Sequence, residues 1–484
     1  MGIHNALKII STLGVISLCT QAYGQYAVGT GKAREIYVAN CASCHGQNGE
    51  GGTGGALINN QWKYGGTDAD LTRAIKDGFP DGGMEAYKDT LTDEEIRALV
   101  IFIREQSQIA ERENLLKRTT PQEGVFSSEK HAFTLEKVAE GGGILWGIDF
   151  LPDDSILVTQ KDGVLWHFSL GFSRKISGIP QVWDFGQGGL MEVAVHPDYE
   201  QNGWIYLGYS ESMEVGGRDV GQTTVVRGRI DDGKWVDEER IWRAPDEFYL
   251  PTRHHFGTRF VFQEGHLFFA IGDRGRRNEA QDLSHPYAKV HRIFDDGRIP
   301  DDNPFLDVAG AYPTTWSYGH RNIQGMDQDP RNGNIWAVEH GPRGGDELNW
   351  IEPGKNYGWA EITYGMNYNG SPITEKTDAP GMEQPELYWV PSIAICGASF
   401  YRGDAFPRWK NNYFIAGMAT EQLHRITIEG ETVVSDEIVM KNQGRVRDVT
   451  TGPDGMLYVL LNSGDPRVGS VYRLVPAGDT LAKK

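Results

Sequence analysis

The chain has 484 residues, with 47 Lys and Arg against 66 Asp and Glu, and a formal net charge of −19. Such an acidic protein is not expected to bind nucleic acid or an anionic membrane, because like charges repel. The length exceeds that of one small domain and suffices for a large hydrophobic core.

An export signal is predicted at residues 1–24. Lys8 precedes the apolar run 9–19, and Ala22 and Gly24 are small residues at the cleavage-determining positions. The run is too short to span a bilayer permanently, and no later segment is long and apolar enough to do so. We therefore expect a soluble periplasmic protein without a membrane span.

The motif CASCH at residues 41–45 is the attachment signature of c-type haem. The thiols of Cys41 and Cys44 add to the porphyrin vinyl groups, and His45 becomes an axial ligand of the iron. A chance cluster or a zinc knuckle is the alternative, but no second Cys/His pair lies nearby to complete a zinc site. Met84 is predicted as the second axial ligand, the alternative being simple packing against the haem.

Helices are expected on both sides of this motif. Residues 31–40 have an amphipathic pattern, and Thr92 with Glu95 forms a capping box that begins a closing helix. This region resembles a small class I cytochrome c. The resemblance implies an all-α domain, assigned to residues 25–106, with covalent heme c and a role in electron transfer.

The remaining cysteines indicate no disulfide framework. Cys19 suggests a lipoprotein as an alternative, although Leu18 before it is larger than the small residue usual there. If Cys41 and Cys44 hold haem, Cys396 is left alone in the mature chain. We expect Cys396 to be a buried, small apolar side chain.

Beyond a polar linker at residues 107–130, one phrase returns six times: an apolar run, a turn and another apolar run. Radial repetition of this kind predicts an all-β six-bladed β-propeller over residues 131–476, followed by a C-terminal tail at 477–484. A β-sandwich is the alternative, but it would not predict so regular a phrase. The six phrases are GIDFLPDDSILVTQ, VAVHPDYEQNGWIYLGY, RFVFQEGHLFFAIG, GMDQDPRNGNIWAVEH, ASFYRGDAFPRWKNNYFIAG and RDVTTGPDGMLYVLLN.

Polar loops rich in His, Arg, Asn and Gly are expected at the mouth of the propeller channel, where propellers place their sites. Arg445 and Arg447 alternate onto one side of a strand, which suits a ligand with several carboxylates, although a solvated strand face is the alternative. The loop segments are residues 254–259, 317–325, 339–349 with 356–359, and 444–448.

In this order the segments resemble the soluble glucose/sorbosone dehydrogenase family over about residues 130 to 476. Members of that family are quinoproteins that use pyrroloquinoline quinone (PQQ) and calcium on a six-bladed propeller. The motifs are specific in combination; they are GGLMEVAVHPDY, GDRGR, SYGHRN-QG, HGP-DELN, NYGW and RVRDVTTGPDGMLYVL.

The resemblance implies roles in the reaction, in cofactor binding and in calcium binding. They are His255 as catalytic base, Arg321 and Asn322 on the quinone carbonyls, Arg445 and Arg447 on the cofactor carboxylates, Gln187 at the substrate mouth, the carbonyls of Gly341 and Pro342 on the cofactor calcium, and Glu347 with Tyr357 at a further calcium.

The chemistry agrees with these roles. Oxidation of an alcohol or a sugar hemiacetal removes the hydroxyl proton while hydride leaves the carbon. Neutral His255 is suited to accept that proton near pH 7. Arg321 and calcium would stabilise the negative charge that develops on the quinone oxygen.

Two departures from the family pattern stand near the predicted site. Ala419 occupies the position of a lysine that helps to polarise the quinone in relatives, so its presence here puts rate or cofactor identity in doubt. Ile395 and Cys396 stand where relatives usually keep a Pro-Ser pair, which indicates an unusual substrate.

The leading interpretation is a periplasmic dehydrogenase for an aldose sugar or related alcohol. Its quinone passes electrons to the fused haem and then to a downstream periplasmic carrier; tethering keeps this acceptor at high effective concentration. One alternative is a non-catalytic propeller that binds carbohydrate or protein, with the haem serving electron transfer. Another is a calcium-dependent lactonase with His255 as base, but it leaves Arg321, Arg445 and Arg447 without a task.

Overall fold

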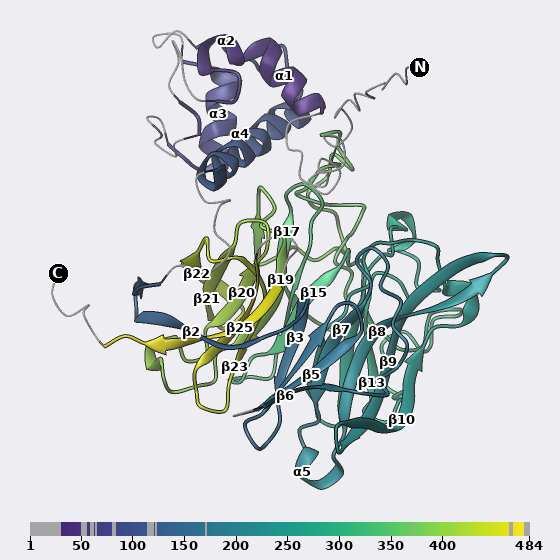
Figure 1. The fold of residues 1–484 in the computed structure, drawn as a ribbon. Helices are drawn as coiled ribbons and strands as arrows, with labels where there is room; N and C mark the ends of the chain where they lie inside the picture. The colour runs from purple at the N-terminus through teal and green to yellow at the C-terminus, as the bar shows by residue number, and fades with distance from the viewer. Residues whose placement is uncertain are drawn as a thin grey trace, which may run out of the picture. The chain divides into compact units, whose positions relative to one another are not determined.

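The computed structural model describes residues 31–49, 56–58, 62, 65–79, 84–113, 121, 123–169, 172–368, 370–463 and 468–478. The chain divides into two compact units, Met1–Ser107 and Gln108–Lys484, each with its own elements (Figure 1). The predicted signal peptide at 1–24 and the end of the predicted C-terminal tail lie outside the described residues.

The described residues of the first unit form four helices, the last of which continues past Ser107: α1 (Lys32–Asn40), α2 (Ala42–His45), α3 (Asp68–Asp77) and α4 (Asp93–Glu113). An isolated β-bridge joins Phe79 to Met84. Buried Tyr37 of α1 packs on Phe102 of α4, with ring centroids 4.9 Å apart. No helix in the described part of the chain is long and apolar enough to cross a membrane. The all-α class of the complete domain stays a prediction.

Helix α4 begins at the predicted capping box. The Thr92 N–H donates to Glu95 Oε2 at 3.1 Å, and the Glu95 N–H donates to Thr92 Oγ1 at 3.2 Å. The helix continues to Glu113 because no proline or glycine interrupts it before Pro121. Regular structure therefore extends into the segment predicted as the linker 107–130, at whose other end strand β1 (Phe126–Ser127) lies.

The second unit is a six-bladed β-propeller, as predicted, built of six antiparallel sheets. Each predicted phrase forms the first two strands of one blade, because hairpins are encoded locally. The blades in chain order are β3 (Leu145–Phe150), β4 (Ile156–Gln160), β5 (Val164–Ser169) and β6 (Phe172–Ile176); β7 (Leu190–Val195), β8 (Ile205–Val215), β9 (Arg218–Asp231) and β10 (Lys234–Arg243); β11 (Phe260–Gln263), β12 (His266–Ile271), β13 (Lys289–Phe294) and β14 (Thr315–Tyr318); β15 (Ile323–Gln328), β16 (Ile335–Glu339), β17 (Asp346–Ile351) and β18 (Leu387–Trp389); β19 (Ile395–Phe400), β20 (Tyr413–Gly417), β21 (Gln422–Glu429) and β22 (Thr432–Lys441); and β23 (Arg445–Thr451), β24 (Leu457–Ser463) and β25 (Val468–Pro476) with β2 (Ala132–Glu140) and β1.

The sixth blade closes the ring with both ends of the propeller chain. Strand β2 pairs antiparallel with β25, from Phe133 opposite Pro476 to Glu140 opposite Ser470 (Figure 1). The N–H of Ala477 donates to the carbonyl of Ala132 at 3.0 Å, so the two ends of the ring meet. In this blade β2 lies between β1 and β25, so neither β2 nor β25 is an open edge of the sheet.

The first strands of neighbouring blades contact one another around the whole ring, so they line the central axis. Arg259, just before β11 in the third blade, reaches Asp448 of the sixth blade with Nη1 2.9 Å from Oδ2. Blades three and six lie opposite each other in a ring of six, so this ion pair crosses the axis. The same Nη1 is 2.7 Å from Glu192 Oε2 of the second blade.

Glycines in other blades make room for this ion cluster, defined as Glu192, Arg259 and Asp448. A Cβ atom at Gly397 would lie 1.8 Å from Asp448 Oδ1, and one at Gly147 would lie 3.3 Å from Glu192 Oε2. Burial raises the pKa of Glu192 to about 8, although Arg259 opposes the shift. One arginine with two carboxylates thus forms a charged plug across the channel.

The two ends of the channel differ. A cavity of about 770 Å³ opens among the turns that follow β3, β7, β19 and β23, where Asp149, His196, Arg402 and Thr451 contribute to its lining. Predicted Gln187, His255, Arg321 and Asn322 stand at the other end, before the first strands of their blades, and Arg445 and Arg447 stand at the start of β23. Gly341 and Pro342 follow β16, Glu347 lies on β17 and Tyr357 follows β17. The charged plug lies between these two ends of the axis.

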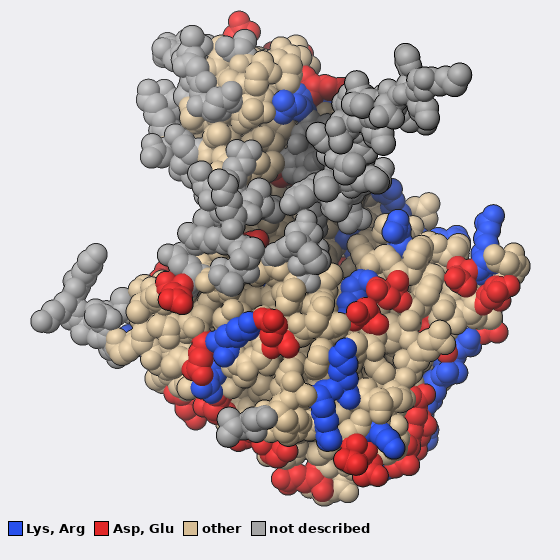
Figure 2. Space-filling model, viewed as in Figure 1, with Lys and Arg blue, Asp and Glu red and all other residues tan. Residues whose placement is uncertain are grey.

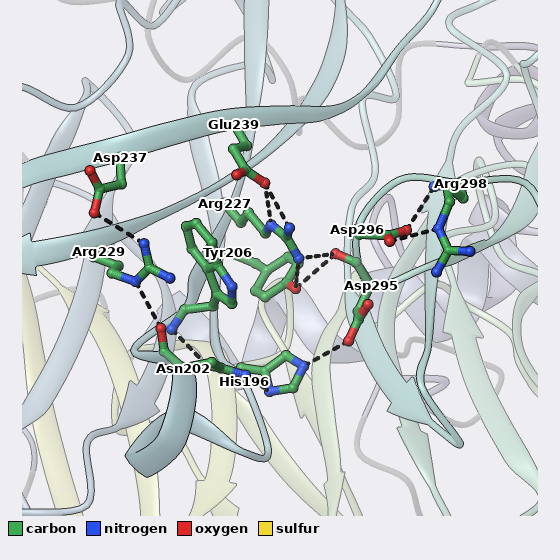
Figure 3. A network of polar contacts seen from close by, with 11 residues as sticks. His196, Asn202, Tyr206, Arg227, Arg229, Asp237, Glu239, Asp295, Asp296 and Arg298 are labelled. Carbon is green, nitrogen blue, oxygen red and sulfur yellow. Dashed lines mark hydrogen bonds and ion pairs between the residues drawn. The ribbon is translucent and has the colours of Figure 1, made fainter.

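A polar network beside the cavity ties the second blade to the third (Figure 3). His196 Nδ1 accepts the N–H of Asp198 at 2.9 Å, so the hydrogen of the neutral ring is on Nε2, which donates to Asp295 Oδ2 at 3.1 Å. Arg227 Nη1 and the Tyr206 hydroxyl both donate to the carbonyl of Asp295. This histidine is therefore a structural link between blades.

Candidate active site

The haem motif occupies the end of α1 and all of α2. The His45 N–H donates to the Cys41 carbonyl at 2.9 Å, so Cys44 and His45 follow Cys41 by about one helical turn on one side of the backbone. Cys41 is half-buried and Cys44 is exposed, and neither forms a disulfide. The local geometry suits attachment of both thiols to one porphyrin.

The predicted second ligand lies on a segment anchored near the cysteines. Met84 is half-buried and its backbone pairs with Phe79. Tyr87, three residues on, donates its hydroxyl to the carbonyl of Asn40 at 2.9 Å. Burial and the nearby Cys41 thiol raise the pKa of Tyr87, which locates its ring beside the haem motif.

In the propeller, His255 lies on an irregular loop before β11 and its ring contacts a buried carboxylate. Its Nδ1 is 2.5 Å from Asp273 Oδ1, while Asp273 Oδ2 accepts the indole N–H of Trp359 at 2.7 Å. The carboxylate accepts from Nδ1, so Nε2 of the neutral ring keeps its lone pair. Nε2 is therefore the atom that is able to accept a proton.

Charge and burial keep this ring neutral. Burial and the positive charge of Arg321 lower the pKa of His255, and Asp273 opposes them. Burial raises the pKa of the Asp273 carboxyl, but the His255 ring and Arg321 outweigh that effect and hold it at about 2. Near neutral pH the pair is an imidazole beside a carboxylate.

Side chains from other blades fix the backbone of the histidine loop. The His255 N–H donates to Gln187 Oε1 at 2.8 Å, and the Gly257 N–H donates to Asn322 Oδ1 at 3.2 Å. Gln324 Nε2 donates to the Gly257 carbonyl at 2.9 Å. Predicted Gln187 and Asn322 are thus brought to His255, and the amide nitrogen of Asn322 is the donor left for a ligand.

Arg321 is buried beside the same pair. Its Nη1 donates to the carbonyl of His340 at 2.8 Å, and its guanidinium lies 5.4 Å from the ring centroid of Trp359. The Arg321 N–H donates to Glu339 Oε2 at 2.5 Å, which fixes the backbone at this residue. The side chain has no carboxylate within ion-pair distance in the described part of the chain.

Arg445 and Arg447 both lie on β23, as predicted. Arg447 covers the ring of Trp146 at 4.2 Å, and its Nη1 lies 3.6 Å from Cys396 Sγ. Its Nε is buried without a hydrogen-bond partner among the residues described. Burial lowers the pKa of Arg447, and no described carboxylate forms an ion pair with it. Arg445 Nη2 lies 3.9 Å from Met418 Sδ.

His340 shows that these groups converge. Burial lowers its pKa well below the ordinary value, and Arg321, His255, Arg447 and Arg445 lower it further by their proximity. The predicted base and the three predicted arginines therefore all lie within electrostatic range of His340. Such a concentration of positive charge suits an anionic ligand.

The predicted calcium carbonyls have the character of cation ligands. Gly341 and Pro342 are buried, and across the described ranges no N–H or O–H donates to either carbonyl oxygen. The Gly341 N–H donates to Asp346 Oδ1 at 2.8 Å, which holds the turn. Buried, unsatisfied carbonyl oxygens are ligands that calcium accepts, so these residues fit the ion.

The second predicted calcium pair is less uniform. Glu347 faces Glu339 across β16 and β17, and burial together with Glu339 raises its pKa well above the ordinary value. Tyr357 has its hydroxyl bonded to the Trp350 carbonyl and its ring stacked on His320, so only its backbone carbonyl is available to an ion. The residues described hold no cluster of three or more His, Cys, Asp or Glu side chains suited to a metal.

Ala419 and Cys396 lie close to these arginines. The N–H of Ala419 donates to the carbonyl of Ile393 at 2.9 Å, next to Met418, which contacts Arg445. Cys396 is fully buried, as expected, but it also contacts Arg447. Neither side chain supplies the positive charge of the lysine found in relatives.

Sequence reasoning did not assign Asp273, Trp359, Gln324 or Trp146. The GDRGR motif contains Asp273 and NYGW contains Trp359. The motifs therefore marked these residues but did not show which residues they contact. Gln324 stands in SYGHRN-QG, which likewise showed no partner, and Trp146 lies on a first strand, where an apolar residue has no distinctive spacing. Contacts between separate blades are what give these residues their positions.

Comparisons with known proteins agree with both parts of the chain. A family model described as Glucose / Sorbosone dehydrogenase matches residues 143–473, and one described as Cytochrome C oxidase, cbb3-type, subunit III matches residues 30–103. Aldose sugar dehydrogenase YliI of Escherichia coli (strain K12) is 42% identical over 340 residues, covering 68% of this chain and 90% of that protein. Quinoprotein glucose dehydrogenase B of Acinetobacter calcoaceticus is 27% identical over 406 residues, covering 66% and 82%. The apo crystal structure of the soluble Escherichia coli aldose sugar dehydrogenase superposes with a TM-score of 0.67 at 39% identity, covering 71% of this chain and 100% of that one.

Proposed function

The chain belongs to the glucose/sorbosone dehydrogenase family, and from that premise we propose that it is a PQQ- and calcium-dependent dehydrogenase that oxidises an aldose sugar or related alcohol. Its electrons pass to the haem of its own N-terminal cytochrome c domain and then to a periplasmic carrier. The name of the quinoprotein relative supports the choice of a quinone cofactor.

One observation carries the proposal. Arg321 and Arg447 are buried cations with no ion pair to a described carboxylate, and both lie near His340, as does His255 of the His255–Asp273 pair. An uncompensated buried charge is costly, so the site is completed by an anion. A quinone with several carboxylates supplies that charge and a redox centre together.

The side chains support proton removal at a defined atom. When bound, PQQ supplies the carbonyl carbon that accepts hydride. His255 Nε2 takes the hydroxyl proton of the substrate, and Asp273 stabilises the imidazolium that results. Arg321 and the Asn322 amide nitrogen would donate to the cofactor carbonyls, and the carbonyls of Gly341 and Pro342 would hold calcium.

The haem domain supplies a one-electron acceptor on the same chain. Cys41, Cys44 and His45 would hold the haem, with Met84 as second ligand. A tether keeps this acceptor at high effective concentration whatever the external supply. The predicted signal peptide and covalent haem both support a periplasmic location.

Anaerobic visible spectroscopy tests the proposal. Haem-loaded protein is reconstituted with calcium and PQQ, and spectra are taken before and after a panel of aldoses and alcohols. We expect substrate-dependent appearance of reduced haem bands that is absent without PQQ and lost in His255→Ala. No PQQ binding and no haem reduction with any substrate would instead support a binding propeller, whereas turnover without PQQ would support a lactonase.

A further inference from the structure

The loop that carries His255 is held almost entirely by side chains. Residues 251–259 form no strand, and several of their backbone groups are hydrogen-bonded to side chains of other segments. Gln187, Asn322 and Gln324 hold His255 and Gly257, and the Thr223 hydroxyl donates to the Phe256 carbonyl. The carbonyls of Thr252 and His254, which lie just before His255 in the chain, accept hydrogen bonds from a further side chain.

That group is Arg274. Its Nη1 donates to the His254 carbonyl at 2.6 Å, and its Nη2 donates to the carbonyls of Thr252 at 3.2 Å and Gly221 at 3.0 Å. The guanidinium lies 3.3 Å from the ring centroid of Phe256. Arg274 is fully buried, so one planar cation joins the loop before β11 to strand β9 of the preceding blade.

No carboxylate of the described residues forms an ion pair with this arginine, which sets it apart from a structural salt bridge. Asp273 precedes it in the chain, but both oxygens of that carboxylate are taken by His255, Gly275 and Trp359. Burial lowers the pKa of Arg274 to about 9. A fold that needed only packing here would use an apolar side chain, because burying an unpaired cation costs free energy.

The geometry points to a purpose for that cost. We propose that Arg274 is the positioning residue of the predicted base: it clamps the backbone on the N-terminal side of His255 while its neighbour Asp273 holds the ring. This assignment rests on the proposed function of the site. The consecutive residues Asp273 and Arg274 thus hold the imidazole ring of His255 and the backbone next to it, respectively.

Two features make arginine the side chain suited to this task. Its rigid fork reaches three carbonyls, and its guanidinium lies over the ring of Phe256, which a lysine ammonium does not reproduce. Phe256 also packs in one apolar cluster with Trp146, the residue under Arg447. Arg274 and Arg447 therefore both contact aromatic rings of the same apolar cluster.

The test compares Arg274→Met with Arg292→Met. Arg292 is the control, because it is also buried in the third blade, covers an indole ring at 4.5 Å and bonds Asn303; unlike Arg274 it has an ion pair, with Asp302, and it lies outside the site. We expect Arg274→Met to lower kcat by about 10- to 100-fold, since a small misplacement of a reacting group has effects of this size. PQQ affinity should stay within about threefold, because other arginines bind the cofactor.

The pH profile separates positioning from simple destabilisation. Asp273 raises the pKa of His255, so a ring that slips from Asp273 should move the acid limb of kcat/KM to lower pH. Arg274→Lys is expected to restore stability more than kcat. Equal losses of kcat in Arg274→Met and Arg292→Met, with unchanged pH profiles, would overturn the proposal.

A second readout does not depend on activity. The amides of His255 and Gly257 are bonded to Gln187 and Asn322, so hydrogen exchange reports on the loop. Faster exchange confined to residues 251–258 in Arg274→Met, and not in Arg292→Met, supports the clamp even if PQQ proves to be the wrong cofactor. Unchanged exchange in that segment contradicts it, whatever the enzyme turns over.

Discussion

Each oxygen of the Asp273 carboxylate has a distinct partner, and this arrangement decides which nitrogen of His255 reacts. Oδ1 accepts from Nδ1 and Oδ2 accepts from Trp359, so the carboxylate does not rotate away from the ring. The consequence is a single tautomer with Nε2 available to substrate. An imidazole without this carboxylate would present either nitrogen.

Asp273→Asn is expected to change both rate and pH dependence. Loss of the carboxylate removes a charge that raises the pKa of His255, so the acid limb of kcat/KM should shift to lower pH. Loss of the fixed tautomer should lower kcat by at least about 100-fold. Steady-state kinetics from pH 5 to 9 measure both effects; an acid limb that moves to higher pH would contradict the assignment.

Arg447→Met is expected to weaken PQQ binding. The variant removes a buried cation whose Nε lacks a partner, and a charged hydrogen bond of this kind contributes about 1.5–3 kcal/mol. The dissociation constant for PQQ, measured by titration calorimetry, should rise by about 10- to 100-fold. Arg473→Met is the control in the same blade, because its ion pairs with Glu136 and Asp454 are exposed. Equal affinity in the two variants would count against the cofactor site.

Sequence alone identified the candidate base and the candidate cofactor arginines but not the residues that support them. His255, Arg321, Arg445 and Arg447 were found because their motifs resemble a known family, and the structure brings them together around His340. Arg274 stands inside a quoted motif, yet its bonds to Thr252 and Gly221 join separate segments. Pairings of that kind have no spacing signal along the chain.

Among the elements, the first strand of each blade lines the central axis, and several predicted site residues lie on or just before such strands. Its hairpin with the second strand is local, and for that reason all six were predictable. The register shifts in these strands, such as the one between Leu190 and Glu192, were not predicted. Such β-bulges re-aim a side chain, and here they accompany the residues on the axis.

Phe133→Ala on β2 is expected to destabilise the propeller. Phe133 is fully buried and contacts Phe126 and Trp409, with ring centroids 5.4 and 5.7 Å apart, so its truncation leaves a cavity in the closing blade. The loss in free energy of unfolding should be about 3–5 kcal/mol, measured by urea denaturation followed by tryptophan fluorescence. Phe172→Ala is the control, because that ring is 46% exposed. A loss no greater than that of the control would show that closure does not depend on this ring.

For the molecule as a whole, charge is distributed in two ways. On the face of the protein drawn in Figure 2, acidic and basic side chains are interspersed. On the propeller axis, by contrast, Glu192, Arg259 and Asp448 are concentrated away from water. The composition indicated an acidic protein, but it gave no sign that charge lies on the axis, because single charged residues on different strands form no motif.

Glu192→Gln is expected to flatten the dependence of stability on pH. The folded pKa of Glu192, about 8, exceeds the ordinary value, so the folded state binds more protons than the unfolded state between about pH 4.5 and 8. Stability from this group is present at low pH and is lost as the pH rises through 8. Thermal melts from pH 5 to 9 should show a smaller decline for the variant. An unchanged slope, equal to that of the exposed control Glu239→Gln, would contradict the shift.

The meeting of Ala132 and Ala477 has a consequence for how such proteins are assembled from modules. Because the ring begins and ends at one point, a domain joined to either end leaves the propeller from the same place. A haem domain encoded after the propeller would sample the same volume as one encoded before it, given a tether of equal length and stiffness. Either order of the two domains is therefore compatible with this ring closure, while the tether sets how often the two domains meet.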